Sequence, residues 1–250
     1  MNARLQRAAA TLLAAAAVDA VAVPAAVTPS GTAVPENLLR LELHLARPLG
    51  HPLAMDHVRL VDRRGETIPG AFLDLPLPGA DGRTVALLLH PGRVKSGVGA
   101  NLALGRALHA GDDVTLVVDD PQLATPLRHR WHVTAAEALR PARWQAQVPR
   151  AGTTAPLRLA LDATVNASSA RLIALRGPGG ERVAGSATLV AGERTWRFRP
   201  ERPWRAGHYD VVVHPLLEDV AGNRACTPFE ATDLSEQPCA IDAPGFEVER

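Results

Sequence analysis

The sequence is poor in many of the residues that carry chemistry in proteins. Its 250 residues include two cysteines, one tyrosine and a single lysine, Lys95, against 26 arginines. The formal net charge is only +1, so bulk charge points to no polyanionic partner and to no membrane surface. After residue 22, no apolar run is long enough to cross a bilayer, and the sequence therefore predicts no membrane span in the mature chain.

Catalytic and metal-binding motifs are also missing. The chain contains no HExxH, no HxH and no GxSxG, and its six serines lie in no recognisable nucleophile context. Among the nine histidines, His129 and His132 are three residues apart on an expected strand and so face opposite sides. We therefore expect no catalytic residues, no cofactor and no metal site, although a metal site assembled across strands stays open as an alternative.

The first 22 residues have the three parts of a secretory signal peptide. Arg4 and Arg7 precede an apolar run over 8–18, and Ala20-Val21-Ala22 is a small-residue cleavage site. The run of about 11 residues is too short to span a bilayer. We expect residues 1–22 to be removed and the mature protein to be secreted or periplasmic, with no choice made between the periplasm and the cell exterior.

Alternation of apolar and polar residues recurs along the rest of the chain. In LRLELHLA (39–46) the leucines share one face, and Arg40, Glu42 and His44 share the other. The same period appears in 83–90, 113–120, 128–133, 195–200 and 208–215. A period of two with one solvated face is typical of antiparallel sheets. After the signal peptide, no long segment has the helical period of 3.6 residues, apart from the short TAAEALRPARW (134–144).

The two halves of the chain match in order. Gly31-Thr32 before one strand matches Gly152-Thr153 before another, and HVRLVDRRGETIPGA (57–71) matches ARLIALRGPGGERVAGSA (170–187). The sequence therefore predicts an all-β chain of two tandem antiparallel β-sandwich domains, over 27–133 and 146–231, each with about seven short strands. We expect a linker at 134–145 and a C-terminal tail at 232–250.

Short motifs in both halves resemble a known family. DVAGN (219–223), after the VVVHPLLE strand, resembles a signature near the end of bacterial Ig-like domains of the surface-layer-protein type. PSGT followed by LRLELHLARPL is similar to the opening of such a domain, whereas the first half has VDDPQLATP (118–126) where the AGN turn would stand. The whole chain also resembles secreted bacterial proteins with paired Ig-like domains. The resemblance implies Ig-like sandwiches and an extracytoplasmic location, and it implies no activity.

The first half carries one large insertion. Between Pro91 and Gly111 it is 13 residues longer than the matching segment from Pro200 to Gly207, which places an inserted loop at 92–110. A nucleotide loop is disfavoured because Leu102 and Val98 stand where the glycine and lysine of such motifs belong. In a second interpretation Arg93, Lys95 and Arg106 bind an anion or an acidic glycan, beside a short helix over 101–108 with Asn101 as its cap. In the favoured interpretation the loop has a structural role, and Leu102, Leu104 and Leu108 pack over a sheet edge or against the second domain.

The end of the second half offers two further predictions. Cys226 and Cys239 form an even pair in an expected oxidising compartment, which favours a disulfide over two free thiols. Asp219 and Asn223 are expected to make side-chain-to-backbone turn bonds with Gly222 at positive φ, rather than to bind calcium. The four tryptophans are expected in the cores or at the domain interface rather than in a sugar-stacking site.

The functional prediction is a secreted, non-enzymatic protein that serves as a cell-envelope binding or scaffold module. Its partner would be an unknown protein or envelope component, and we expect no nucleic acid. The alternative is a periplasmic binding protein that holds an anionic small molecule or glycan through Arg93, Lys95 and Arg106. A scaffold requires a fixed interface between the domains, whereas the alternative requires a loop whose cations face a ligand.

Overall fold

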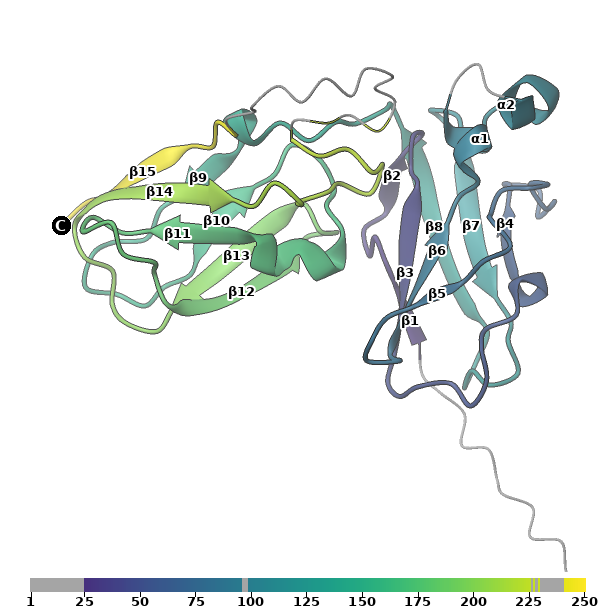
Figure 1. Cartoon of the computed structure of the whole chain (residues 1–250), viewed down its shortest axis with the longest axis horizontal. Helices are drawn as coiled ribbons and strands as arrows, with labels where there is room; N and C mark the ends of the chain where they lie inside the picture. The colour runs from purple at the N-terminus through teal and green to yellow at the C-terminus, as the bar shows by residue number, and fades with distance from the viewer. Residues whose placement is uncertain (1–24, 96–98, 226, 228, 230–240) are drawn as a thin grey trace, which may run out of the picture.

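The computed structural model describes residues 25–95, 99–225, 227, 229 and 241–250. The chain is all-β and folds as two tandem Ig-like sandwich domains, whose strands run in clearly different directions in Figure 1. The predicted signal peptide lies outside the described residues. Cys226 and Cys239 also lie outside them, so their disulfide stays a prediction.

The first domain packs two four-stranded sheets face to face. One sheet has the order β1 (Ala25–Thr28), β3 (Arg40–Leu45), β6 (Thr84–Leu88) and β5 (Leu77–Pro78). The other has the order β2 (Ala33–Pro35), β8 (Leu127–Thr134), β7 (Asp113–Val118) and β4 (Val58–Val61). Only β2 and β8 pair in parallel within this domain. Short helices complete it at η1 (Met55–His57), α1 (Pro91–Val94) and α2 (Gly99–Leu104).

The second domain repeats this arrangement. Its first sheet has the order β12 (Gly185–Val190), β13 (Thr195–Pro200), β10 (Leu157–Ala160) and β9 (Gln145–Gln147). Its second sheet has the order β11 (Ile173–Arg176), β14 (Gly207–Val213) and β15 (Gly245–Val248). Two 3-10 segments, η2 (Pro141–Arg143) and η3 (Ala167–Leu172), lie in its connections. Read from β9, the order of the first sheet matches β1-β3-β6-β5, and β11-β14-β15 matches β4-β7-β8.

Strand β15 departs from the predicted C-terminal tail. It pairs antiparallel with β14, from Gly207 opposite Val248 to Asp210 opposite Gly245. Phe246 and Val248 are buried in the second core. The last strand of the fold must cover an open edge of β14, and a short GFEV segment is enough to do so. Residues 245–248 are therefore part of the second domain and not of a tail.

Alternation along the strands builds two separate cores. The inward side chains of β3, β6 and β7 lie in one cluster of buried residues, and those of β10, β13 and β14 lie in the other. All four tryptophans are at most 3% exposed, as expected from the sequence. Each indole N–H is satisfied; that of Trp131, for example, donates to the Pro29 carbonyl at 3.1 Å. A buried indole that keeps its hydrogen bond contributes packing without an unpaired donor.

Two local expectations fail, and both failures come from packing. The predicted helix over 134–144 is absent except for the single turn η2, because Pro141 disfavours helix at Arg140 and because Leu139 and Trp144 are drawn into the second core. The expected solvated face of β3 is partly covered. Glu42 is only 1% exposed, and the Ser168 hydroxyl of η3 donates to its Oε1 at 3.2 Å. The second domain therefore covers this part of β3.

Candidate functional site

The structure brings the predicted anion-binding residues only partly together. Arg93 is 4% exposed, and its guanidinium donates to three backbone carbonyls: those of Pro69, of Gly105 (2.6 Å from Nε) and of Arg106 (3.1 Å). A guanidinium satisfies several carbonyls at once because its five N–H donors form a fixed fork. Arg93 therefore ties the inserted loop to the β4–β5 connection, and it does not face an external anion.

Lys95 and Arg106 point to different neighbours. The Lys95 ammonium lies 4.2 Å from the centroid of the Phe229 ring, in a cation–π contact with a residue beyond the DVAGN segment. Arg106 lines a groove of about 560 Å³ together with three other arginines and four acidic residues, namely Arg63, Arg64, Arg93, Asp62, Glu66, Asp112 and Asp113. Lys95 is not among the residues that line this groove. Mixed charge and a divided triad do not favour anion binding here.

The loop's own packing agrees in part with its predicted structural role. Leu108 is 1% exposed and belongs to the first core, whereas Leu102 is 77% exposed and Leu104 is 54% exposed. Asn101 lies inside α2, and its carbonyl accepts the Gly105 amide at 2.8 Å, so it is not the cap that was expected. The cation–π contact of Lys95 reaches the segment that follows the second domain's signature turn.

The better-built site is the junction between the domains. Val220 of the DVAGN turn is buried in the core of the first domain. Its carbonyl accepts the amides of Leu39 and Arg40, at 2.8 and 3.0 Å, immediately before and at the start of β3. Gly222 is at φ +80°, and a side chain there would meet the Leu39 Cδ2 atom at 2.7 Å. The turn of the second domain therefore continues the backbone hydrogen bonding of the first.

The segment that connects the two domains also contributes to the junction, through Glu137. Asn37 and Glu137 bond reciprocally: Asn37 Nδ2 donates to the Glu137 carbonyl at 2.8 Å, and the Glu137 amide donates to Asn37 Oδ1 at 3.1 Å. The Glu137 carboxylate in turn accepts the Thr164 amide at 3.1 Å and Arg194 Nη1 at 2.5 Å. Residue 137 was expected in a linker, and it forms hydrogen bonds with both the first and the second domain.

Asp219 organises the signature turn from within. Its carboxylate accepts the amides of Ala221, Asn223 and Leu139 at 2.9, 2.8 and 3.1 Å, and also the Asn223 Nδ2 at 2.9 Å. These are the turn bonds that the sequence predicted, with Gly222 at positive φ. Burial raises the pKa of Asp219 to about 6, against the opposing effect of the hydrogen bonds from Asn223, Ala221 and Leu139.

A second junction contact comes from the β12–β13 hairpin. Glu193 is only 6% exposed, and its carboxylate accepts the Ser30 amide at 2.6 Å and the Ser30 hydroxyl at 2.8 Å. Three successive residues of the hairpin, Ala191, Gly192 and Glu193, have φ between +55° and +67°. Non-glycine residues in this region store strain. The strained hairpin aims Glu193 at the first domain.

Two glycines allow this close approach. A Cβ atom on Gly192 would lie 2.8 Å from the Gly31 Cα, and a Cβ atom on Gly31 would lie 3.2 Å from the Gly192 Cα. The domains therefore meet backbone to backbone at this point, a distance that no larger residue permits. The alignment of the halves singled out Gly31, but it assigned no role to Gly192 or Glu193.

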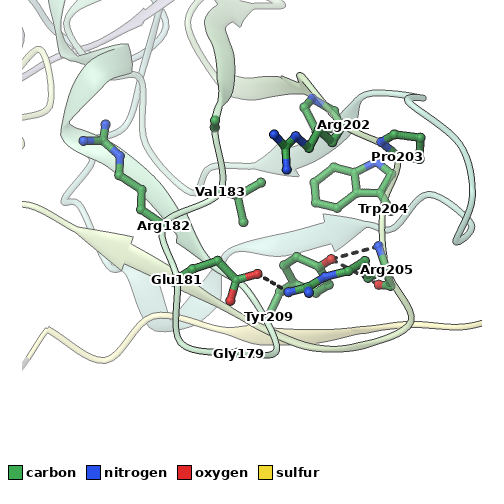
Figure 2. A pocket seen from close by; sticks show the side chains of 11 residues that line it. Gly179, Glu181, Arg182, Val183, Arg202, Pro203, Trp204, Arg205 and Tyr209 are labelled. Atoms are coloured by element: carbon green, nitrogen blue, oxygen red, sulfur yellow. Dashed lines mark hydrogen bonds and ion pairs between the residues drawn. The ribbon is translucent and has the colours of Figure 1, made fainter.

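A pocket lies at the opposite end of the second domain, among the β11–β12 and β13–β14 connections (Figure 2). Its volume is about 450 Å³, and Trp204 and Tyr209 form part of its wall. Both aromatic residues are 3% exposed, so they contribute an apolar wall and not a stacking platform. The Tyr209 hydroxyl accepts the Arg205 amide and donates to the Arg205 carbonyl, each at 3.1 Å.

The polar groups of this pocket are mostly arginines. Arg205 pairs with Glu181, while Figure 2 shows the Arg202 side chain near the Trp204 ring and Arg182 directed away from it. Both partners of the Arg205–Glu181 pair are about half exposed, so the pair adds little stability. Among the described residues, no serine, cysteine or histidine lines the pocket.

The described residues contain neither a membrane-spanning helix nor a cluster of metal ligands. Across the part of the chain that the structure describes, no helix is long and apolar enough to cross a membrane. Among the same residues, no group of three or more histidine, cysteine, aspartate or glutamate side chains is placed to hold a metal ion.

Comparisons with known proteins give only distant likenesses to solved structures. No protein-family model matches the chain, and no curated protein matches it. Among solved structures, domains 5–6 of the S-layer protein SbsC are 10% identical over 75% of this chain and 89% of that chain, with a TM-score of 0.26. The titin A168–A169 pair is 9% identical over 72% of this chain and 84% of that one, with a TM-score of 0.22.

The junction residues could not be found from the sequence. Ser30 and Glu193 are 163 positions apart, and Asn37 and Glu137 are 100 apart. Polar residues of these types are usually solvated, and a lone glutamate after a turn glycine carries no signal for a distant partner. Only the DVAGN motif marked the region, and it did so as a turn rather than as an interdomain contact.

Proposed function

We propose that the chain is a non-enzymatic, secreted or envelope-associated module in which two Ig-like domains present binding surfaces in a fixed relative orientation. The observation that carries the proposal is the junction. The Val220 carbonyl, the Asn37–Glu137 pair and the Glu193–Ser30 pair join the domains at three separate places. Contacts from both the DVAGN turn and the β12–β13 hairpin restrict the movement of one domain against the other.

The nature of the contacts supports the same conclusion. A flexible linker leaves its amides to water and its side chains exposed. Here Leu139 is buried in the second core, and its amide donates to Asp219. The predicted secretion rests on the N-terminal sequence, and the non-enzymatic character rests on the lining of the pocket and on the missing catalytic motifs. The alternative of an anion site in the inserted loop is not favoured, because Arg93 is occupied by carbonyls.

Residual dipolar couplings and ¹⁵N relaxation on residues 23–250 test the orientation. A fixed pair gives one alignment tensor and one overall correlation time for amides of both domains. Two tensors of different magnitude, or a shorter correlation time for one domain, would show independent motion and contradict the proposal. The variant Glu193→Gln keeps the size of the side chain but removes its charge, and it should loosen only the hairpin contact. A matched control is Glu201→Gln, at an exposed site away from the junction.

A further inference from the structure

One face of the second domain carries positive charge without any acidic residue. The sheet β9-β10-β13-β12 turns Leu157, Leu159, Trp196 and Phe198 into the core, so the alternate residues point outward. Three of these outward residues are Arg158, Arg197 and Arg199. The four strands read QAQ, LRLA, TWRFRP and GSATLV, and they contain no aspartate or glutamate.

The register brings the three arginines together. Arg158 lies directly opposite Arg197, and Arg199 lies two residues further along the same strand. Directly opposed residues have Cβ atoms about 5 Å apart, and residues i and i+2 of a strand are about 7 Å apart. The same rung continues to Gln147 on one side and Thr188 on the other, and Ser186 lies opposite Arg199. We call these six residues the basic sheet face.

The arginines of this face stand without partners. Among the residues that the structure describes, Arg158, Arg197 and Arg199 make no side-chain hydrogen bond and no ion pair. On the sheet β2-β8-β7-β4, by contrast, two arginines are neutralised: Arg59 pairs with Asp119 at 2.6 Å and Arg130 with Asp113 at 2.9 Å. Like charges placed directly opposite each other destabilise a sheet. The basic sheet face is thus an unfavourable arrangement for the isolated domain that an anionic partner would relieve.

We propose that the basic sheet face binds a linear acidic polysaccharide, one that carries carboxylate or sulfate groups on successive or alternate sugars. The guanidinium fork offers paired N–H donors to either anion. The glutamine, threonine and serine side chains beside the arginines offer donors and acceptors to sugar hydroxyls. A row of donors along an exposed sheet face suits an extended polymer rather than a small molecule, since small-molecule sites are concave.

The composition of the face argues against other partners. Protein partners usually need a buried aromatic or large apolar anchor, and the face supplies none, because its remaining outward side chains are small or polar apart from Val190. Single-stranded nucleic acids stack their bases on exposed aromatic rings, and every tryptophan of this domain is buried. An acidic polysaccharide needs neither anchor nor stacking platform.

The inference deepens the proposed function, since it rests on the chain being a binding module and names the chemistry of one partner. The two ideas can nevertheless fail separately. The domain orientation is read from the amide couplings, and it does not depend on any ligand. Binding of a polysaccharide is read from a titration, and it does not depend on the junction, because the face lies wholly within the second domain.

The test is a titration of residues 23–250 by isothermal calorimetry with polygalacturonate, which carries carboxylates, and with heparin, which carries sulfates. The test variant is Arg158→Gln/Arg197→Gln/Arg199→Gln. The matched control is Arg47→Gln/Arg83→Gln/Arg128→Gln, which makes the same change in net charge at three exposed arginines of the first domain. Because removing opposed like charges relieves repulsion, the test variant should fold at least as stably as the wild type.

We expect the test variant to weaken binding of at least one polysaccharide by tenfold or more, while the control variant stays within twofold of the wild type. Three ionic contacts also predict a slope of about −2 to −3 for the logarithm of the association constant against the logarithm of salt concentration. Equal losses in both variants would mean non-specific charge attraction and overturn the proposal. So would binding to neither polysaccharide, or binding only to a DNA oligonucleotide or to phosphatidylglycerol vesicles run in parallel.

Discussion

Substitution of Gly192 by alanine is expected to separate the domains without unfolding them. The new Cβ atom would lie 2.8 Å from the Gly31 Cα and 3.1 Å from the Gly31 nitrogen. Both are backbone atoms of the first domain, so no flexible side chain can move aside. The hairpin must withdraw, and Glu193, the next residue, withdraws with it from the Ser30 amide.

The free-energy cost of Gly192→Ala can be estimated by comparison with a glycine of similar backbone conformation. Gly180 is at φ +80° in the same domain, and a Cβ atom there would have no neighbour within 4 Å. Gly180→Ala therefore costs only the left-handed backbone strain, about 1–2 kcal/mol. Gly192, at φ +67°, carries the same strain plus an overpacking cost of about 1–3 kcal/mol. The difference between the two variants isolates the contact between the domains.

Amide hydrogen exchange at Ser30 reports this contact directly. In the wild type the Ser30 amide is 2.6 Å from Glu193 Oε2. A loss of about 1–3 kcal/mol at the junction corresponds to exchange roughly 5- to 150-fold faster, because each 1.4 kcal/mol is a factor of ten. Core amides such as that of Leu159 should change equally in the two variants. If the Ser30 amide exchanges at the same rate in Gly192→Ala as in Gly180→Ala, the β12–β13 hairpin does not hold the two domains together.

Three other changes test separate parts of the structure. Arg93→Ala leaves the carbonyls of Pro69, Gly105 and Arg106 without their donor, and it should lower the free energy of urea unfolding of the first domain by about 2–4 kcal/mol. Arg63→Ala, at an exposed site, should change this free energy by less than about 0.5 kcal/mol. Equal effects of the two substitutions would contradict the buried structural role of Arg93. Asp219 has a folded pKa raised from 3.8 to about 6, so its stabilising contribution is complete below pH 3.8 and is lost as the pH rises through 6. The unfolding free energy of the wild type should therefore rise relative to that of Asp219→Asn as the pH falls from 7 to 5. A difference that stays constant over this range would contradict the raised pKa of Asp219. Arg158→Thr removes one of two opposed arginines and should raise the free energy of unfolding by about 0.2–1 kcal/mol at low salt. This gain should disappear in 0.5 M NaCl, because salt screens the repulsion. A lower free energy of unfolding would show that Arg158 and Arg197 do not repel each other.

Local sequence patterns were enough to predict the fold class and six of the longer strands, β3, β6, β7, β8, β13 and β14. Leucines at every second position in 39–46 place a half-buried strand there, and β3 occupies Arg40–Leu45. Such alternation is local, since it depends only on neighbouring residues and the pleat. The DVAGN turn was predictable for the same reason, because Asp219 bonds to amides two and four residues ahead. Repetition of these local patterns also indicated two sandwiches.

The burial of polar residues and the pairing of cations, in contrast, could be read only from the folded chain. Glu42 and Arg158 look alike in the sequence, as charged residues at outward positions of alternating strands. The second domain covers Glu42, whereas Arg158 stays exposed opposite Arg197. Arg93 looked like a ligand-binding cation until the fold placed three carbonyls around it. These outcomes depend on contacts between residues distant in sequence, and the free energy of burying a charge is set by partners that no local pattern records.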